Sequence, residues 1–319
     1  MKVLITGGAG FIGSNLSKHF LDSNQFETVR VVDDLSTGSR KNLTGLDVEF
    51  IEGSILDKSI LTHAMEEIDS VVHLGAIPSV PRSIAHPVRS HDANSTGTLM
   101  VLEAARAQEV EQVIVASSSS VYGSNPKLPK HEDDWTRPMS PYAVSKLATE
   151  GYALAYQAAY GLKTLAFRFF NVYGPGQAAD HDYAAVIPKF IDAALTGRSA
   201  QIYGDGTQSR DFTYVDTVCQ VITEAVLNKR YSNAPMNLAF NTNTTLLELL
   251  DEIENILGQK VERQHREPRR GDVKASQADS TSVSQMFPNV RPTKLSDGLT
   301  ETISWFKKEL VTRKGLENG

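Results

Sequence analysis

A glycine-rich turn near the start of the chain joins a short apolar strand, residues 3–6, to a helix. The turn contains Gly7, Gly8, Gly10 and Gly13. The helix has apolar residues at helical spacing, at Phe11, Ile12, Leu16 and Phe20. Glycines at this spacing allow a tight turn and let the helix lie close to the strand that precedes it. This pattern is typical of the first strand and helix of a parallel α/β sheet.

Short apolar runs alternate with helical patterns over the first half of the chain. Further strands are expected at residues 29–32, 48–51, 71–74, 113–116 and 164–169. Longer helices are expected at residues 97–106 and 142–160. Because strands joined through helices lie parallel, we predict an α/β fold, a Rossmann-type doubly wound parallel sheet with a smaller α/β lobe.

The pattern becomes less regular after Asn171, with more proline and longer loops. Helices are still expected at residues 186–196 and 246–257. We expect residues 1–170 to form the first domain, with part of 205–240 returning to it, and residues 171–319 to form mainly a substrate-binding lobe. Open parallel sheets bind ligands at the carboxyl ends of their strands, so the site is expected in the cleft between the lobes.

Composition and charge argue against several classes of protein. The 319 residues include 32 Lys and Arg against 38 Asp and Glu, so the net charge of −6 gives no reason to expect a nucleic-acid partner. Cys219 is the only cysteine, which rules out an internal disulfide. No apolar run approaches the roughly 20 residues of a membrane span. We therefore expect no membrane partner and a cytoplasmic location. His73, His91 and His131 lack ligand spacing, so no metal is expected.

The glycine turn and the end of the second strand form a candidate dinucleotide site. A helix N terminus presents backbone N–H groups and the positive end of its dipole to a pyrophosphate, and glycines allow its close approach. Asp33 ends the second strand, where a carboxylate accepts hydrogen bonds from an adenosine ribose and repels a 2′-phosphate. This favours NAD over NADP, although Arg40 and Lys41 lie close by in the sequence.

A second group of polar residues lies in the middle of the chain. Four consecutive serines, residues 117–120, follow an apolar strand. Tyr142 and Lys146 stand at positions i and i+4 of a predicted helix, so their side chains share one face. An ammonium beside a phenol lowers the pKa of the tyrosine, which can then exchange a proton with a substrate hydroxyl near neutral pH. These residues predict an acid–base site.

Together with further motifs, these segments resemble the extended short-chain dehydrogenase/reductase family, and within it the NAD-dependent nucleotide-sugar epimerases and dehydratases. The matching segments are TGGAGFIG (6–13), HLGA (73–76), NSTG (94–97), SSSSVYG (117–123), SPYAVSK (140–146), RFFNVYGP (168–175), SRDFTYVD (209–216) and EPRRGDV (267–273). The resemblance implies NAD as cofactor in the first domain, a UDP-sugar in the smaller lobe, and Ser118, Tyr142 and Lys146 as catalytic residues. The implied cofactor-binding residues are Gly7, Gly10, Phe11, Ile12, Gly13, Asp33, Ser54, Ile55, Leu74, Ala76, Asn94, Tyr142 and Lys146.

The two residues after the catalytic serine separate reaction types within this family. In the 4,6-dehydratases they are Asp and Glu, the acid and base for removing water, and in the UDP-glucuronate decarboxylases the second is Glu. Here they are Ser119 and Ser120, which have no titratable proton near pH 7. The resemblance is therefore to the UDP-GlcNAc and UDP-glucose 4-epimerases. It implies that Tyr142 takes the proton of the sugar O4 while the C4 hydride passes to NAD⁺. The 4-keto sugar then turns over and receives the hydride on its other face.

The resemblance also implies which residues hold the UDP-sugar. They are Ser118, Ser119, Ser120, Tyr142, Asn171, Ala185, Val186, Lys189, Tyr203, Arg210, Arg269, Asp272 and Ser276. Residues 183–190 resemble the uracil segment of epimerases that act on N-acetylated sugars. Ser276 stands where UDP-galactose 4-epimerases vary between tyrosine and a small residue. A serine leaves room for an N-acetyl group, so UDP-GlcNAc and UDP-GalNAc are expected as substrates, with UDP-Glc and UDP-Gal also accepted.

Two positions depart from the family pattern. Ser54 replaces the usual adenine-contacting Asp. Gly75 replaces the first Ala of the usual HLAA motif, which reads HLGA here. The alternative functions are a UDP-glucose 4-epimerase only, then a UDP-glucuronate 4-epimerase, and, in a different class, a non-catalytic NAD-binding sensor. The family commonly pairs through two long helices, so a homodimer is expected through residues 97–108 and 147–160.

Overall fold

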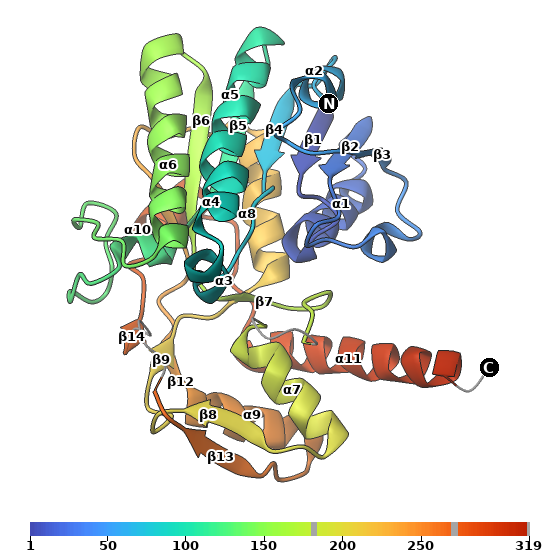
Figure 1. Ribbon diagram of the computed structural model, residues 1–319, viewed down its shortest axis with the longest axis vertical. Helices are drawn as coiled ribbons and strands as arrows, with labels where there is room; N and C mark the ends of the chain where they lie inside the picture. Colours follow the sequence, from blue (N-terminus) through green and yellow to red (C-terminus); the bar gives the residue numbers. More distant parts are fainter. Residues whose placement is uncertain (180–183, 269–273, 318–319) are drawn as a thin grey trace.

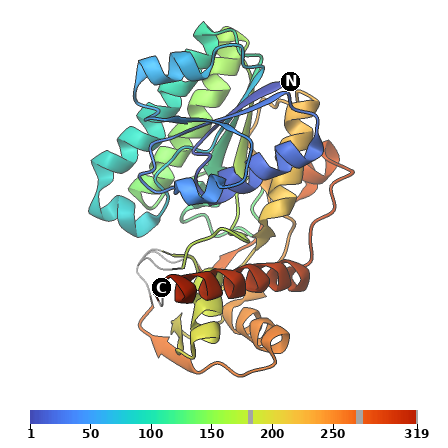
Figure 2. The same ribbon diagram turned by 90° about the vertical axis from the view of Figure 1, so that its right-hand side faces the viewer.

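The computed structural model describes residues 1–179, 184–268 and 274–317. Two lobes lie one above the other along the long axis of the molecule (Figures 1 and 2). The larger lobe contains a sheet of seven parallel strands, whose carboxyl ends point towards the smaller lobe (Figure 1). The site expected between the lobes therefore lies at the edge of the sheet where parallel strands bind ligands.

The sheet of the larger lobe has its first strand near the middle. In spatial order the strands are β11 (Met236–Leu238), β6 (Lys163–Phe169), β5 (Gln112–Ser118), β4 (Ser70–His73), β1 (Lys2–Thr6), β2 (Thr28–Asp33) and β3 (Glu49–Glu52). The chain leaves β1 in one direction to build β2 and β3, then crosses back to build the other side. This confirms the doubly wound parallel sheet predicted from the alternation of strands and helices.

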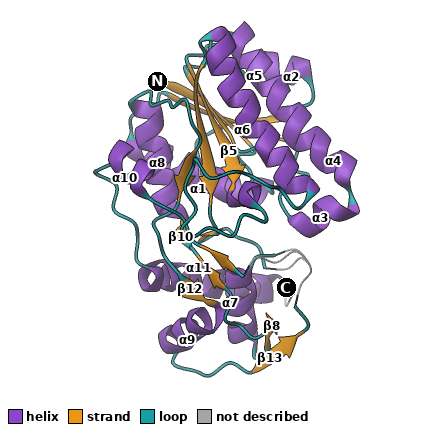
Figure 3. Ribbon diagram, turned by 90° about the vertical axis from the view of Figure 1, so that its left-hand side faces the viewer, coloured by secondary structure: helices purple, strands orange, loops and turns teal. Residues whose placement is uncertain are grey.

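Helices cover both faces of this sheet (Figure 3). One face packs against α1 (Phe11–Ser23), α8 (Val215–Leu227) and α10 (Thr281–Met286). The other packs against α2 (Lys58–Ala64), α5 (Gly97–Ala107) and α6 (Pro141–Tyr160). Most of the strand residues are buried, as expected for a parallel sheet that is covered on both sides.

Three segments from the second half of the chain pack in the larger lobe. β11 pairs with β6, so Met236 lies beside Phe167. α8 fills the same core as β1 and β6, and so do Val283 of α10 and Phe287 after it. The domain boundary at residue 170 stays a prediction. Beyond that boundary, α8, β11 and α10 belong to the core of the larger lobe.

The smaller lobe has its own hydrophobic core between short strands and helices. Its helices are α7 (Val186–Thr196), α9 (Leu246–Leu257) and α11 (Leu295–Glu317). Its strands are β7 (Val172–Tyr173), β8 (Ala200–Tyr203), β9 (Ser209–Arg210), β10 (Thr213–Tyr214), β12 (Thr244–Thr245), β13 (Arg263–Arg266) and β14 (Ala275–Ser276). α9 begins with a capping box between Thr245 and Glu248. In the three described ranges no helix combines the length and apolarity needed to cross a bilayer.

Short helical turns complete the larger lobe. They are η1 (Arg40–Leu43), α3 (Val80–Ala85), α4 (Pro87–His91), η2 (Asp92–Thr96) and η3 (Ser119–Tyr122). α3 and α4 lie beside the start of α6 at the lower edge of the sheet (Figure 3). η3 follows β5 directly, so the serine row runs from the end of a central strand into a tight turn at the cleft.

Candidate active site

A cavity of about 540 Å³ lies at the carboxyl ends of β1, β2 and β4. The predicted cofactor residues that line it are Gly7, Asp33, Ser54, Ile55 and Ala76. The wall opposite the sheet comes from α4 and the start of η2, which the sequence had not indicated. The Ser54 hydroxyl accepts a hydrogen bond from the Leu56 amide at 3.2 Å, so the residue that replaces the usual Asp shapes the local turn.

The glycines of the turn have different tasks. Gly7 has a positive φ of 71°, and a Cβ there would lie 2.7 Å from the Gly75 Cα atom. A Cβ on Gly13 would lie 2.4 Å from the Gly7 carbonyl oxygen. Both residues must therefore be glycine for the backbone to pack. A Cβ on Gly10 would meet only the Gly7 oxygen, at 3.2 Å, so the absent side chain keeps the space before α1 open.

The amino end of α1 fits a pyrophosphate. The N-cap residue of α1 is Gly10, which has no side chain to accept a capping hydrogen bond, and the first turn contains no acidic residue. Its backbone N–H groups and the positive end of the helix dipole therefore remain available for an anion. Phe11 and Ile12 begin this helix and pack partly against the core, whereas Leu74 donates its amide to the Thr6 carbonyl at 3.0 Å.

Asp33 is held rigidly at the end of β2. Its Oδ2 accepts a hydrogen bond from the Ala9 amide at 3.0 Å and its Oδ1 accepts one from the Leu35 amide at 2.8 Å. Burial raises the pKa of Asp33, and these two bonds oppose the shift. Arg40 pairs with Glu52 at 2.7 Å and Lys41 with Glu309 at 2.6 Å. A fixed carboxylate to which neither Arg40 nor Lys41 is paired favours NAD over NADP.

Asn94 holds together the elements around the cavity. Its Oδ1 accepts a hydrogen bond from the Ile77 amide at 2.7 Å, and its Nδ2 donates to the Ile77 carbonyl at 3.1 Å and to the Ser145 hydroxyl at 3.0 Å. The side chain is almost completely buried. Asn94 thereby fixes the loop after β4 against α6, and a direct contact with the cofactor stays a prediction.

The predicted catalytic residues come together where β5 ends and α6 begins. Ser140 caps α6 by accepting a hydrogen bond from the Ala143 amide at 3.1 Å, and Pro141 occupies the first turn. This cap places Tyr142 in the first turn of α6, with its phenol close enough to the Ser118 side chain for Ser118 to oppose the rise in its pKa. The Lys146 ammonium donates to the Ala116 carbonyl at 2.8 Å, and burial lowers the pKa of Lys146 to about 8.

The pKa of Tyr142 differs from the sequence expectation. Burial raises it, and the hydrogen bond from Ser118 only partly opposes the shift. The expected lowering by Lys146 is absent because the ammonium points to the Ala116 carbonyl rather than to the phenol. Bound NAD⁺ would supply a positively charged ring, which favours the phenolate.

The two residues after Ser118 present hydroxyls only. Ser119 and Ser120 begin η3, and the Ser120 amide donates to the Ser118 hydroxyl at 3.2 Å. The Ser120 hydroxyl is buried and has no hydrogen-bond partner in the described part of the chain. A buried hydroxyl without a partner, just beyond the carboxyl end of β5, is suited to a polar ligand, because an unpaired polar group is costly.

A second cavity of about 240 Å³ lies in the smaller lobe. It is lined by predicted substrate residues, namely Asn171, Ala185, Val186, Lys189, Tyr203 and Arg210. Ser276 lies beside it, since β14 pairs with β9 and places Ser276 opposite Arg210. Arg269 and Asp272 lie outside the described residues, as does Tyr183 at the start of the uracil segment.

Gln177 is a lining residue that the sequence did not single out. It belongs to the wall of the second cavity, and its Nε2 donates to the Val172 carbonyl at 3.2 Å. Its Oε1 is buried and finds no hydrogen-bond partner within the described ranges, which suits it to accept a bond from a ligand. It stands in a loop of irregular pattern, so neither periodicity nor residue type marked it.

His73 lies on β4 below the site but is part of the core. Its Nδ1 lies 2.7 Å from the Thr6 hydroxyl and its Nε2 lies 3.0 Å from the Thr98 hydroxyl. Burial lowers the pKa of His73 to about 3, so the ring stays neutral. Among the described residues no group of three or more His, Cys, Asp or Glu side chains is placed to hold a metal.

Comparison with known proteins gives one consistent family. The model of the NAD-dependent epimerase/dehydratase family matches residues 3–239. The UDP-glucose 4-epimerase of Mycolicibacterium smegmatis is 34% identical over 316 residues, covering 97% of this chain and 99% of that protein. The structure of the UDP-N-acetylglucosamine 4-epimerase from Methanobrevibacter ruminantium M1 with UDP-N-acetylmuramic acid has a TM-score of 0.91 and 35% identity, covering 97% of this chain and 98% of that one. The Thermus thermophilus UDP-glucose 4-epimerase complex with NAD has a TM-score of 0.86 and 33% identity, covering 96% of this chain and 99% of that one.

Proposed function

Since this chain belongs to the NAD-dependent epimerase/dehydratase family, we propose that it interconverts the C4 epimers of a UDP-hexose. It is an enzyme, and its cofactor is NAD. The proposed substrates are UDP-GlcNAc and UDP-GalNAc, with UDP-Glc and UDP-Gal also accepted. Epimerisation of a UDP-hexose is the activity named for all three similar proteins described above.

The contact between Tyr142 and Ser118 is the observation that carries this proposal. It joins a phenol and a hydroxyl from two different elements at the carboxyl edge of the sheet. The next two residues, Ser119 and Ser120, supply no carboxylic acid. The set can remove and return a proton at one sugar hydroxyl but has no acid–base pair there to expel water. This favours epimerisation over dehydration.

Each residue has a task in the proposed reaction. The Ser118 hydroxyl holds the sugar O4 beside Tyr142, and the phenolate of Tyr142 takes the O4 proton. NAD, when bound, would supply reversible hydride chemistry at C4, first as acceptor in its oxidised form and then as donor in its reduced form. Tyr142 then returns its proton to the oxygen, so the phenolate is restored. Lys146 would hold the nicotinamide ribose through its buried ammonium.

The smaller lobe supports the proposed choice of substrate. Ser276 is small and lies opposite Arg210 in the short sheet next to the second cavity. Arginine binds a diphosphate through two parallel hydrogen bonds, so the sugar that follows the diphosphate would lie near Ser276. A serine at this place leaves the volume that an N-acetyl group requires.

We also propose a homodimer through α5 and α6. α6 exposes apolar side chains at three positions along its length, with Val144 54%, Tyr152 37% and Tyr160 58% exposed. Exposed apolar side chains along one helix are typical of a helix-pairing interface.

The decisive experiment gives the purified protein UDP-GlcNAc, UDP-Glc or UDP-GlcA and resolves the C4 epimers. We expect conversion of UDP-GlcNAc, and about a 10³-fold lower turnover for Tyr142→Phe with unchanged folding and NAD content. Conversion of UDP-GlcA alone would favour the glucuronate epimerase. Bound NAD without turnover of any UDP-sugar would favour the sensor, and full activity of Tyr142→Phe would refute the assigned base.

A further inference from the structure

Ser117, the first residue of the serine row, faces away from the cleft. Side chains alternate along a strand, so Ser117 and Ser118 point to opposite sides of β5. The Ser117 hydroxyl is buried and lies 2.7 Å from the Glu150 Oε2 and 3.3 Å from the Lys146 carbonyl oxygen, both on α6. Ser117 therefore connects the strand that ends at Ser118 to the helix that carries Tyr142.

Glu150 is buried on α6 and forms an ion pair with Arg168 of β6. The Arg168 Nη2 donates to the Glu150 Oε1 at 2.7 Å and its Nε donates to the Oε2 at 3.0 Å. The two side chains are each 4% exposed. Tyr142, Lys146 and Glu150 recur every four residues, which places them along one side of the helix. A two-bond pair of this kind allows one relative orientation of its partners.

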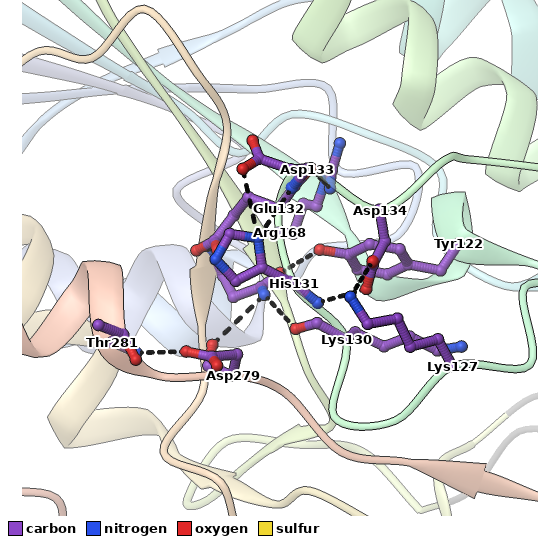
Figure 4. Close-up of polar contacts among 11 residues, drawn as sticks. Tyr122, Lys127, Lys130, His131, Glu132, Asp133, Asp134, Arg168, Asp279 and Thr281 are labelled. Atoms are coloured by element: carbon purple, nitrogen blue, oxygen red, sulfur yellow. Dashed lines mark hydrogen bonds and ion pairs between the residues drawn. The ribbon is translucent and has the colours of Figure 1, made fainter.

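Arg168 also holds the far end of the serine row. Its guanidinium lies over the Tyr122 ring at 4.7 Å from the ring centre, and its Nη1 donates to the Glu132 carbonyl at 3.2 Å (Figure 4). The Tyr122 hydroxyl donates to the Asn237 side chain at 2.7 Å. Because Tyr122 ends η3, the segment with the catalytic hydroxyl is fixed on both sides, at Ser117 and at Tyr122.

We propose that Ser117, Glu150 and Arg168 are positioning residues that set the distance between the Ser118 and Tyr142 hydroxyls. The inference rests on the proposed function, in which these two hydroxyls act on one sugar oxygen. The contacts of these three residues join β5 and β6 to α6, the elements that carry Ser118 and Tyr142, so they act through these two residues rather than on the substrate. Misplacement of reacting groups by about 1 Å lowers rates by about 10².

Ser117→Ala is the first test, because it removes the hydroxyl contacts to Glu150 and to the Lys146 carbonyl oxygen and leaves the Glu150–Arg168 ion pair intact. We expect kcat for the UDP-hexose to fall about tenfold, with KM within twofold and NAD content unchanged. Ser70→Ala is the matched control. It removes a buried hydroxyl that donates to Gln112 at 3.2 Å, at the amino ends of the strands and away from the cleft. Its kcat should equal that of the wild type.

Arg168→Lys is the second variant, since it keeps the charge but loses the planar fork. We expect a folded protein with kcat lowered about a hundredfold and a nearly constant KM. An active wild type with an unchanged kcat for Ser117→Ala would refute this inference alone. Equal losses of kcat in Ser117→Ala and Ser70→Ala would also refute it. A loss of kcat/KM in Ser117→Ala that comes entirely from a higher KM would refute it as well. A wild type that converts no UDP-hexose would refute the proposed function and this inference together.

Discussion

Lys146 is a charged group in a place that disfavours charge. It is 6% exposed, and its ammonium has the Ala116 carbonyl as its neighbour rather than a carboxylate. Burial lowers the pKa of Lys146 from 10.5 to about 8. In the unfolded chain the same group keeps its ordinary pKa, so folding with a charged Lys146 costs free energy below pH 8. Such a cost is typical of a functional residue.

Lys146→Met should therefore stabilise the protein freed of its dinucleotide. At pH 7 the gain in unfolding free energy should be roughly 3 kcal/mol, from a shift of about 2.5 pH units. Wild-type stability should rise between pH 8 and 10.5, because the unfolded chain binds the extra proton there, and the difference should vanish near pH 10.5. Urea unfolding at pH 7 and at pH 10 measures the unfolding free energy of the wild type and of Lys146→Met.

Lys18→Met is the control for this comparison. Lys18 is exposed on α1 and pairs with Asp22 at 2.7 Å. Its removal should change stability little and equally at both pH values. A Lys146→Met protein that is less stable than the wild type at pH 7 would contradict the burial cost.

At the scale of elements, α6 and the turn after η3 set the geometry of the site. Gly161, which has a positive φ of 72°, caps the end of α6, and Gly151 lies in the middle of the helix with open space around the position of a Cβ. Gly123 follows η3 with a φ of 49°, and a Cβ there would lie 1.8 Å from the Arg137 carbonyl oxygen. The backbone therefore tolerates a side chain at Gly151 but requires glycine at Gly123.

Replacing these two glycines by alanine should have opposite effects. Gly151→Ala should raise the unfolding free energy by about 0.5–1 kcal/mol, because alanine loses less entropy in a helix. Gly123→Ala should lower it by at least about 2 kcal/mol, because a fixed backbone oxygen occupies the space of the new Cβ. Chemical denaturation of both variants checks the prediction, and equal midpoints would contradict it.

At the scale of the whole molecule, the site needs both lobes. The larger lobe contributes the first cavity, Ser118 and Tyr142, and the smaller lobe contributes the second cavity and Ser276. Segments from the second half of the chain pack in the core of the larger lobe, so several chain crossings connect the lobes. In the proposed function, the size of the accepted sugar would therefore be set by Ser276, a residue far in sequence from Ser118 and Tyr142.

Ser276→Tyr should narrow the range of sugars. A tyrosine fills the space proposed for the N-acetyl group, so turnover of UDP-GlcNAc should fall by about 10- to 200-fold while that of UDP-Glc stays within a few-fold. Ser284→Tyr, at an exposed position of α10, is the control and should leave both rates unchanged. Equal losses for the two sugars in Ser276→Tyr would contradict a role in sugar size.

Local patterns determined much of the fold. The glycine turn, the apolar strands and the longer helices depend on neighbouring residues, so their order predicted the doubly wound sheet. The spacing of Tyr142 and Lys146 placed them on one helical face for the same reason. Family motifs indicated residues that prove to line the two cavities, such as Asp33 and Arg210. The sequence showed that Ser54 departs from the family pattern. It did not show that the Ser54 hydroxyl accepts a hydrogen bond from the Leu56 amide.

Sequence alone determined the elements and the chemical groups, because strand and helix periodicity and residue type are local properties. Tertiary structure decided which groups meet. It turned the Lys146 ammonium to Ala116, left the Gln177 Oε1 without a hydrogen-bond partner among the described residues, and joined Glu150 to Arg168 and Ser117. These contacts depend on the packing of segments distant in the chain, and no periodicity within one segment records such packing.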